Sequence, residues 1–223
     1  MHLGQKLTQA VFLVLLIGAL ATGRHGPVAA DLTGIATGAT EIHPLGVGER
    51  APSFTVRTVD DQPFTFDPDA LERPVVLITF RGGWCPYCNL HLSELRTVVP
   101  VLASRGIDVY FLSGDRPELL YASLKRETQE DIDGLGYTIL SDAGIDAARA
   151  LGIAFLADPA YIARRDEQGD IEGSSMKNFG VLPVPAVFVI DTDGRVTYAF
   201  VEPDYKVRLP ANDLLEAVET LAD

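Results

Sequence analysis

The sequence predicts an α/β domain in which a central mixed β-sheet is flanked by helices on both faces, with a β-hairpin at its N-terminal end. Three apolar runs rich in β-branched residues, 75–80, 107–112 and 184–190, have the length and composition of buried strands. Helical patterns follow the first two runs, as crossovers between parallel strands require. Hairpin signals before the first run and after the last add antiparallel strands, so the sheet should be mixed.

Each element has its own local signal. Residues 51–57 and 63–66 alternate apolar and polar side chains around the turn residues 60–62, which predicts the N-terminal hairpin. The helix after strand 75–80 is expected to be kinked or broken at Pro100, which has no backbone N–H to donate. The further elements expected, in chain order, are a strand at 107–112, a helix at 117–127, a strand at 137–140, a helix at 143–151, a hairpin of strands 184–190 and 195–201, and a closing helix at 212–221.

Residues 154–182 have a weaker pattern. The stretch 154–163 is expected to be partly helical, and the charged, glycine-containing stretch 164–175 is expected to form a loop. A long irregular stretch inside a compact domain is often functional or poorly ordered, and the sequence leaves both readings open.

Residues 1–30 have the pattern of an export signal peptide or of an N-terminal anchor. Lys6 precedes the apolar run 10–21, whose 12 residues suit the core of a signal peptide and fall short of the ~20 needed to cross a bilayer. Small residues at 28–30 form a cleavage site, whereas an uncleaved anchor would use residues 7–23. Either form predicts an extracytoplasmic location, periplasmic or secreted, for the rest of the chain.

Two parts follow this segment. Residues 31–44 are rich in glycine, threonine and alanine and are expected to be a linker, and residues 45–223 are expected to form one domain. Without residues 1–30 the formal net charge changes from −13 to −15, because Lys6 and Arg24 are removed and no acid is. So acidic a chain argues against nucleic acid and anionic lipid as partners.

Both cysteines of the chain lie in the stretch 81–88, Arg-Gly-Gly-Trp-Cys-Pro-Tyr-Cys, between a buried strand and a helix. Cys85 falls near the helix N-cap and Pro86 at the first helical position, where proline is favoured. The free N–H groups and positive dipole of a helix N-terminus stabilise an anion, here a thiolate. Cys85 and Cys88 are one helical turn apart, so they can form a reversible, redox-active disulfide.

The expected roles of these residues follow from their positions. Cys85 should be the exposed thiol with the lowered pKa, and Arg81, Pro86 and Tyr87 are the neighbours expected to tune it. Cys88 lies one turn further in and should attack the mixed disulfide that Cys85 forms with a substrate.

Other uses of two cysteines fit the sequence less well. A structural zinc site needs about four ligands, and no second C-x-x-C accompanies His91. Covalent haem attachment requires histidine after Cys88, where the chain has Asn89. A purely structural disulfide across so short a loop would stabilise little. Thiol exchange without a metal or another cofactor is therefore the expected chemistry.

The stretch Trp84 to Cys88 resembles the thioredoxin active site, with a Cys-Pro-Tyr-Cys core similar to that of glutaredoxins. Together with residues 48–54 and 184–191, the longer stretch 80–90 resembles the peroxiredoxin-like branch of the redoxin (alkyl hydroperoxide reductase/thiol-specific antioxidant) family, and the resemblance covers about residues 45–206. This resemblance implies a thioredoxin fold with Cys85 as the attacking thiol.

The chain departs from the peroxiredoxin pattern at two positions that help activate peroxide. Peroxiredoxins carry Thr or Ser three residues before the attacking cysteine, where this chain has Gly82, and Arg six residues before the Asp that closes the late strand, where it has Pro185. Thioredoxins place a cis-proline there, so the resemblance implies a cis Val184–Pro185 bond. The backbone N–H and C=O of Val184 would then be free to bind an extended substrate, with Trp84 as an apolar wall beside it.

Three classes of function follow. Both departures favour a thiol–disulfide oxidoreductase that acts on extracytoplasmic protein disulfides. The alternative is a peroxiredoxin-type thiol peroxidase with an antioxidant role, in which Cys85 is peroxidatic and Cys88 resolving. The third is a binding module such as a metal chaperone. The two enzymes would need a protein disulfide or a peroxide as substrate and a thiol or protein electron donor, and would contact a membrane only if residues 7–23 are retained.

Overall fold

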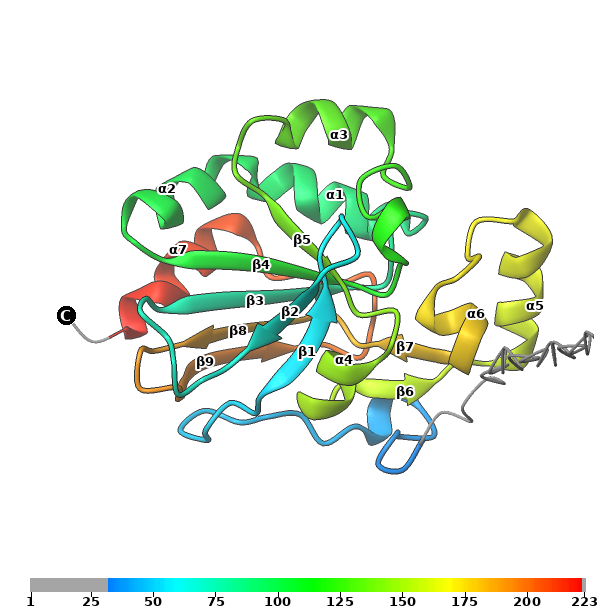
Figure 1. Cartoon of the computed structure of the whole chain (residues 1–223), viewed down its shortest axis with the longest axis horizontal. Helices are drawn as coiled ribbons and strands as arrows, with labels where there is room; N and C mark the ends of the chain where they lie inside the picture. The colour runs from blue at the N-terminus through cyan, green and yellow to red at the C-terminus, as the bar shows by residue number, and fades with distance from the viewer. Residues whose placement is uncertain (1–31, 222–223) are drawn as a thin grey trace, which may run out of the picture. The chain divides into compact units, whose positions relative to one another are not determined.

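The computed structural model describes residues 32–221 and confirms the expected architecture (Figure 1). Over these residues the main sheet has seven strands in the order β2-β1-β5-β4-β3-β8-β9. Strands β3 (Val75–Phe80), β4 (Asp108–Ser113) and β5 (Thr138–Ser141) are parallel neighbours. The hairpin β1 (Phe54–Arg57) and β2 (Pro63–Phe66) extends one edge, and the hairpin β8 (Ala186–Ile190) and β9 (Val196–Val201) extends the other, both antiparallel to their neighbours.

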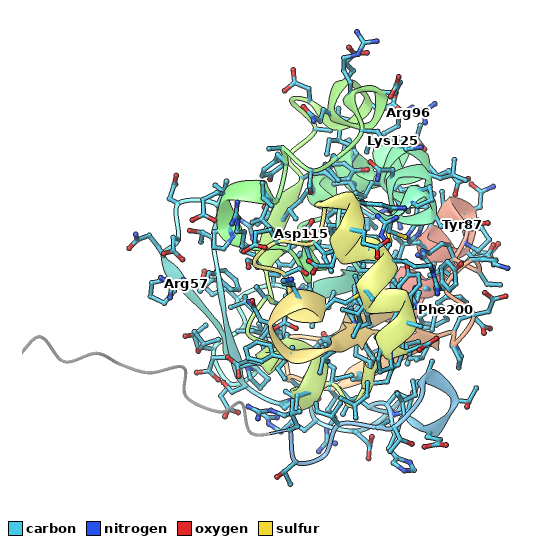
Figure 2. All side chains as sticks on the ribbon, turned by 90° about the vertical axis from the view of Figure 1, so that its right-hand side faces the viewer. Arg57, Tyr87, Arg96, Asp115, Lys125 and Phe200 are labelled. Carbon is cyan, nitrogen blue, oxygen red and sulfur yellow. The ribbon has the colours of Figure 1, made fainter. Side chains whose placement is uncertain are left out.

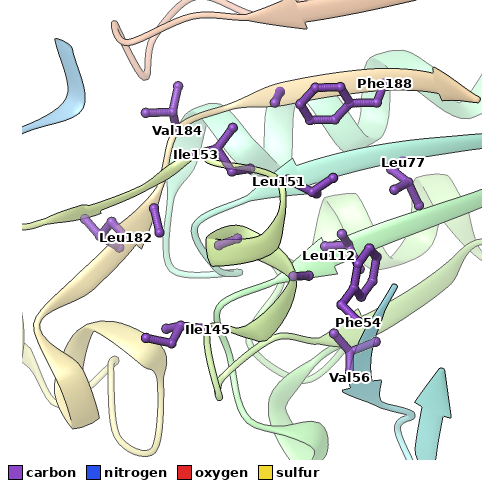
Figure 3. Packing of buried hydrophobic residues seen from close by; sticks show 14 of the residues in the cluster. Phe54, Val56, Leu77, Leu112, Ile145, Leu151, Ile153, Leu182, Val184 and Phe188 are labelled. Atoms are coloured by element: carbon purple, nitrogen blue, oxygen red, sulfur yellow. The ribbon is translucent and has the colours of Figure 1, made fainter. Parts of the chain in front are cut away.

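Strand β3 lies between two hydrophobic cores. Its residues are all buried, and alternate side chains point to opposite faces of the sheet. Val76 and Ile78 pack with the helices α1 (Pro86–Glu94), α2 (Val99–Ser104) and α7 (Ala211–Ala217). Val75 and Leu77 face the other core, which contains α4 (Asp146–Ala150) and is drawn in Figure 3. Burial on both faces fixes the end of β3, and that end carries the two cysteines.

The helix after β3 begins and breaks where the sequence predicted. Cys85 is the N-cap of α1 and Pro86 occupies its first turn. A 3₁₀ turn, η2 (Leu95–Thr97), separates α1 from α2, whose first turn contains Pro100. Proline lacks the N–H that would continue the ladder of α1, so the chain restarts as a second helix. Leu90 on α1 is 57% exposed, although a leucine in an amphipathic helix is expected on the buried face.

The expected helix at 117–127 is wrong in its position. A 3₁₀ turn, η3 (Pro117–Leu119), comes first, and the α-helix α3 (Arg126–Ile132) begins only after Lys125. The side-chain oxygen of Asn89 accepts a hydrogen bond from the backbone N–H of Lys125 at 2.7 Å. This contact ties the start of α3 to α1.

Residues 154–182 form an ordered insertion. It consists of β6 (Ala154–Leu156), α5 (Pro159–Gln168), α6 (Ser175–Phe179) and β7 (Val181–Pro183), and β6 pairs with β7 as a separate antiparallel sheet. The prediction of a loop from residue 164 is wrong in its first part, because α5 is capped by Asp158 and continues to Gln168. Figure 1 shows α5 and α6 beyond one end of the main sheet.

Residues 32–44, expected to be a linker, pack against this insertion. The backbone N–H of Ala36 donates to Ala154 O at 3.2 Å, and the N–H of Leu156 donates to Ala36 O at 2.8 Å. The segment also contains the short turn η1 (Ala39–Glu41). The predicted signal peptide or anchor lies outside the described residues, and within 32–221 no helix is both long and apolar enough to cross a membrane.

Candidate active site

The turn between β3 and α1 is held by buried side chains from later parts of the chain. Asp115 follows β4, and its carboxylate accepts hydrogen bonds from the Gly83 N–H at 2.7 Å and the Ser123 hydroxyl at 2.8 Å. On the other side Asn89 donates to Gly83 O at 2.6 Å. Burial raises the pKa of Asp115 to about 6, although both donors oppose the shift. Figure 2 views the molecule toward α5 and α6 and labels Asp115.

Gly82 cannot be replaced by a larger residue in this turn. Its φ is +152°, and an added Cβ would lie 2.4 Å from Trp84 Nε1 and 2.5 Å from Asp115 Oδ1. The hydroxyl-bearing residue that peroxiredoxins carry at this position therefore does not fit the observed turn. The missing Thr or Ser is a property of the local backbone and not only of the sequence.

Gly83 gives a direct test of how tightly the turn is packed. A Cβ there would lie 2.1 Å from Ser123 Oγ and 2.5 Å from the backbone carbon of Ser123. We expect Gly83→Ala to lower the free energy of unfolding of the reduced protein by about 1–3 kcal/mol, the usual effect of overpacking. Chemical denaturation measures this change. The control is Gly38→Ala, where an added Cβ meets nothing within 4 Å; equal stability losses in both variants would contradict the prediction.

Both cysteines are free thiols, and both are buried. Cys85 is 1% exposed and Cys88 is 0% exposed, so the expectation that Cys85 would be the exposed thiol is wrong for this conformation. The pair is part of the core formed with α1, α2 and α7, where residues of the loop 202–210 also pack. The sequence of residues 81–88 alone does not show that other parts of the chain bury the two thiols.

Three further residues predicted around the pair, Trp84, Pro86 and Tyr87, are half-buried or exposed. The ring of Tyr87 packs edge-on against Tyr205 of the loop 202–210, with centroids 5.7 Å apart. Trp84 is half-buried, and the guanidinium of Arg165 from α5 lies 4.7 Å from its ring centroid. Pro86 is exposed. Thus the insertion covers one side of the Trp-Cys-Pro-Tyr-Cys turn and the loop 202–210 covers the other.

Arg208 makes the contact that decides the electrostatics of the pair. Its Nη2 donates to Cys88 Sγ at 3.3 Å. Burial raises the pKa of Cys88, but the hydrogen bond from Cys85, the charge and hydrogen bond of Arg208, and the backbone N–H of Arg81 together lower it to about 6. The hydrogen bond to Cys88 and burial raise the pKa of Cys85. In this conformation the contact with Arg208 therefore favours the thiolate at Cys88 over one at Cys85, opposite to the prediction.

The loop 202–210 is anchored so that Arg208 stays at the sulfur. His91 on α1 donates from Nε2 to Leu209 O at 3.1 Å, and Arg208 Nη1 donates to the carbonyl oxygens of Tyr205 and Val207. Burial lowers the pKa of His91 to about 4, with a further contribution from the charge of Arg208. The ring is therefore neutral at pH 7 and keeps its N–H on the nitrogen that faces the loop.

The predicted substrate platform at Val184–Pro185 is wrong in its backbone. No peptide bond within residues 32–221 is cis, so Val184–Pro185 is trans. The N–H of Val184 donates to Ile153 O at 2.9 Å, and its carbonyl accepts from the Thr79 hydroxyl at 2.9 Å. Both groups are therefore used inside the fold, because the β6–β7 insertion packs at this strand end. Pro185 is buried, and its carbonyl accepts from the Glu202 N–H at 3.1 Å.

Sequence reasoning missed Arg208, Asp115, Asn89 and His91. Asp115 had one local signal, since it stands three residues after the end of the predicted central strand 107–112, where buried polar groups can reach the site. Arg208 had none, because the contact joins positions 120 residues apart in the sequence. Within the described part of the chain, no group of three or more His, Cys, Asp or Glu side chains could hold a metal ion.

Comparison with known proteins identifies the family of the chain. The sequence profile of the AhpC/TSA family matches residues 47–199. The thiol-disulfide oxidoreductase ResA of Bacillus thuringiensis subsp. konkukian is 20% identical over 157 residues, which are 70% of each chain. The peroxiredoxin Bcp of Escherichia coli is 23% identical over 159 residues, which cover 71% of this chain and 87% of the relative.

Two solved structures show the same fold. A peroxiredoxin-like protein from Aquifex aeolicus superposes with a TM-score of 0.54 at 23% identity, covering 80% of this chain and 89% of its own. Reduced Prx3 from Vibrio vulnificus, solved with hydrogen peroxide, gives a TM-score of 0.59 at 19% identity, covering 78% and 99%. The fold is that of thioredoxin, as predicted. Because the family profile matches more than half of the chain, the protein belongs to the AhpC/TSA family and is an oxidoreductase.

Proposed function

We propose that this oxidoreductase is a thiol–disulfide exchange enzyme that cycles Cys85 and Cys88 between a dithiol and a disulfide. The observation that carries the proposal is the pair itself: the two thiols are hydrogen-bonded across one helical turn, and Arg208 stabilises the thiolate of Cys88. Two cysteines one helical turn apart can form and break a disulfide with each other.

The reaction has two steps in the reducing direction. A thiolate of Cys85 attacks one sulfur of the substrate disulfide, so a mixed disulfide forms and the first substrate thiolate leaves. The thiolate of Cys88 then attacks Cys85 Sγ, the Cys85–Cys88 disulfide forms, and the second substrate thiolate leaves. Two electrons have passed from the dithiol to the substrate, and an external thiol returns them.

The groups around the pair favour this exchange over peroxide chemistry. The turn at Gly82 excludes the hydroxyl that peroxiredoxins place three residues before the cysteine. Position 185 is a buried proline and offers no guanidinium. One observation favours the alternative, a thiol peroxidase with Cys85 peroxidatic and Cys88 resolving: at 1% exposure, Cys85 in this conformation suits a small oxidant better than a protein.

Turnover with two substrates separates the two activities. We expect the reduced protein to reduce insulin disulfides and the small neutral disulfide of 2-mercaptoethanol, with dithiothreitol as electron source, and to consume hydrogen peroxide much more slowly. Rapid peroxide consumption without disulfide reduction would assign the protein to the peroxidases of its family. A protein inactive with both substrates would leave the pair without the proposed role.

We also propose that the enzyme works outside the cytoplasm, on protein disulfides in the periplasm or in the medium. The support is the sequence of residues 1–30, which has the order of charge, apolar run and small residues found in export signals. Mass spectrometry of the native protein should find a mature chain that starts near Asp31, or an intact N-terminus in the membrane fraction. An intact chain in the cytoplasm would contradict the proposal.

A further inference from the structure

Arg81 is a buried cation without an acidic partner. The residue is 6% exposed, and among residues 32–221 its Nε has no hydrogen-bond partner. Its guanidinium instead faces aromatic rings, with its carbon 4.1 Å from the centroid of Tyr205 and 5.9 Å from that of Phe155. Cation–π contacts offset part of the cost of burying the charge, but a buried cation normally also has an anion beside it. The site therefore has unused donors for an anion.

The groups around Arg81 make this place attractive to a negative charge. Tyr161 on α5 lies within electrostatic reach of Arg81, Arg165 and Cys85: burial raises the pKa of its phenol, and the two guanidinium groups lower it. Arg165 already donates to Asp170 and to Trp84 O. Within residues 32–221 the Nε of each arginine lacks a hydrogen-bond partner, but Arg165 already has the carboxylate of Asp170 beside it and Arg81 has no acidic partner.

The thiolate of the pair is not the missing anion. Arg208 contacts Cys88 Sγ through its side chain, whereas Arg81 supplies its backbone N–H to Cys88. The side chain of Arg81 points instead between Tyr205 of the loop 202–210 and Phe155 of the insertion. The two arginines thus face different groups, Arg208 a protein sulfur and Arg81 two aromatic rings.

We propose that Arg81 binds the carboxylate of a low-molecular-weight thiol, and that this acidic thiol is the electron donor that reduces the Cys85–Cys88 disulfide. This inference rests on the proposed exchange function and identifies the chemical class of the electron donor to the disulfide. A small molecule fits because Cys85 is 1% exposed under the insertion and the loop 202–210. A carboxylate fits because a guanidinium binds it through two parallel, charge-assisted hydrogen bonds.

Two molecules of the donor thiol reduce the Cys85–Cys88 disulfide in two exchange steps. The donor thiolate attacks Cys85 Sγ of the disulfide, forming a mixed disulfide, and Cys88 leaves as a thiolate that Arg208 stabilises. A second donor thiolate attacks the donor sulfur of the mixed disulfide, so the donor leaves as its own disulfide and Cys85 takes up a proton. Two donor thiols are oxidised and one protein disulfide is reduced.

Three monothiols of equal chain length test the charge preference. The oxidised protein is mixed with excess 3-mercaptopropionate, 2-mercaptoethanol or cysteamine, and its reduction is followed by tryptophan fluorescence or by trapping free thiols. For each thiol, the rate measured with the wild-type protein is divided by the rate measured with Arg81→Gln, so the intrinsic reactivity of that thiol cancels. We expect a ratio of about ten or more for 3-mercaptopropionate, near one for 2-mercaptoethanol, and below one for cysteamine.

Two controls separate a binding role from a structural one. Arg164→Gln removes a charge from an exposed guanidinium next to Arg165 on the same helix and should leave all three rates close to wild type. In the wild-type protein, 3-(methylthio)propionate, a thioether that cannot exchange, should inhibit reduction by 3-mercaptopropionate, and neutral 2-(methylthio)ethanol should not. The second control needs no variant to fold.

Distinct results overturn the inference and the proposed function. Equal ratios for all three thiols, or no inhibition by the acidic thioether, would overturn the carboxylate subsite while disulfide exchange stands. A preference confined to peptide disulfides with Glu beside the cysteine would overturn the assignment to a small thiol. If no thiol reduces the pair and no disulfide forms between Cys85 and Cys88, the proposed function itself fails.

Discussion

Replacing Cys88 with serine is expected to stop turnover after the first chemical step and to leave the protein joined to its substrate. Cys85 can still attack a disulfide, but no thiolate remains one turn away to release the mixed disulfide. We expect turnover to fall by several orders of magnitude, and mass spectrometry to find covalent adducts of substrate at Cys85. Cys85→Ser should be equally inactive but free of adducts, because Cys88 lies inside α1, one turn after the N-cap position of Cys85, and is assigned to attack Cys85 and not the substrate.

The pair of variants also identifies the attacking sulfur. In this structure Arg208 favours the thiolate at Cys88. If Cys88 were the sulfur that attacks the substrate first, the adducts would appear in Cys85→Ser and not in Cys88→Ser. That result would reverse the assigned roles. A Cys88→Ser protein with full turnover would show that the enzyme works through Cys85 alone and would remove the two-cysteine mechanism.

The fold could be predicted from sequence because its signals are local. The run Val75–Phe80 is apolar except for Thr79, which indicates a strand buried on both faces, and the structure places it inside the sheet between β4 and β8. The N-cap position of Cys85 and the break at Pro100 follow from backbone chemistry that depends on one residue and its immediate neighbours. The insertion at residues 154–182 had no such signal, because its two strands have three residues each.

The site could be predicted only where it is contiguous. Residues 81–88 gave the two thiols and the helix N-terminus. They could not reveal that the backbone N–H and C=O of Val184 are hydrogen-bonded to Ile153 and Thr79. The bond to Ile153 forms only because the insertion packs at this strand end in the folded protein. Nor could they place Arg208 at Cys88, because a contact between a loop and a helix leaves no periodic trace in the sequence. The sequence therefore predicts that the helix N-terminus stabilises the thiolate, whereas in the structure the guanidinium of Arg208 does so at Cys88.

Two groups can stabilise a thiolate of the pair: Arg208 acts at Cys88, and the N-terminus of α1 acts at Cys85. While Arg208 contacts the sulfur, the charge stays on Cys88, and Cys85 holds the shared proton. Movement of the loop 202–210 would remove Arg208 and uncover Cys85 together, leaving the helix N-terminus as the remaining stabiliser of a thiolate at Cys85. Opening and activation of the attacking thiol would then be one event.

Arg208→Gln should therefore raise the pKa at which the reduced pair loses its first proton, which is about 6 at Cys88 in the wild type. If the pKa returned to the ordinary thiol value of about 8.5, the thiolate fraction at pH 7 would fall about thirtyfold. Ultraviolet absorbance of the thiolate measures the titration. Lys206→Gln, an exposed residue of the same loop, removes the same charge away from the sulfur and is the control.

The same substitution should change how stability depends on pH. A pKa lowered from the ordinary thiol value of about 8.5 to about 6 stabilises the reduced fold fully above about pH 8.5, and this stabilisation is lost as the pH falls toward 6. Denaturation of the reduced wild type should show that decline between pH 9 and 6, and Arg208→Gln should show a shallower one. Parallel pH profiles for wild type and Arg208→Gln, with an unchanged thiolate titration, would mean that Arg208 does not set the charge on Cys88 and that the helix N-terminus acts alone.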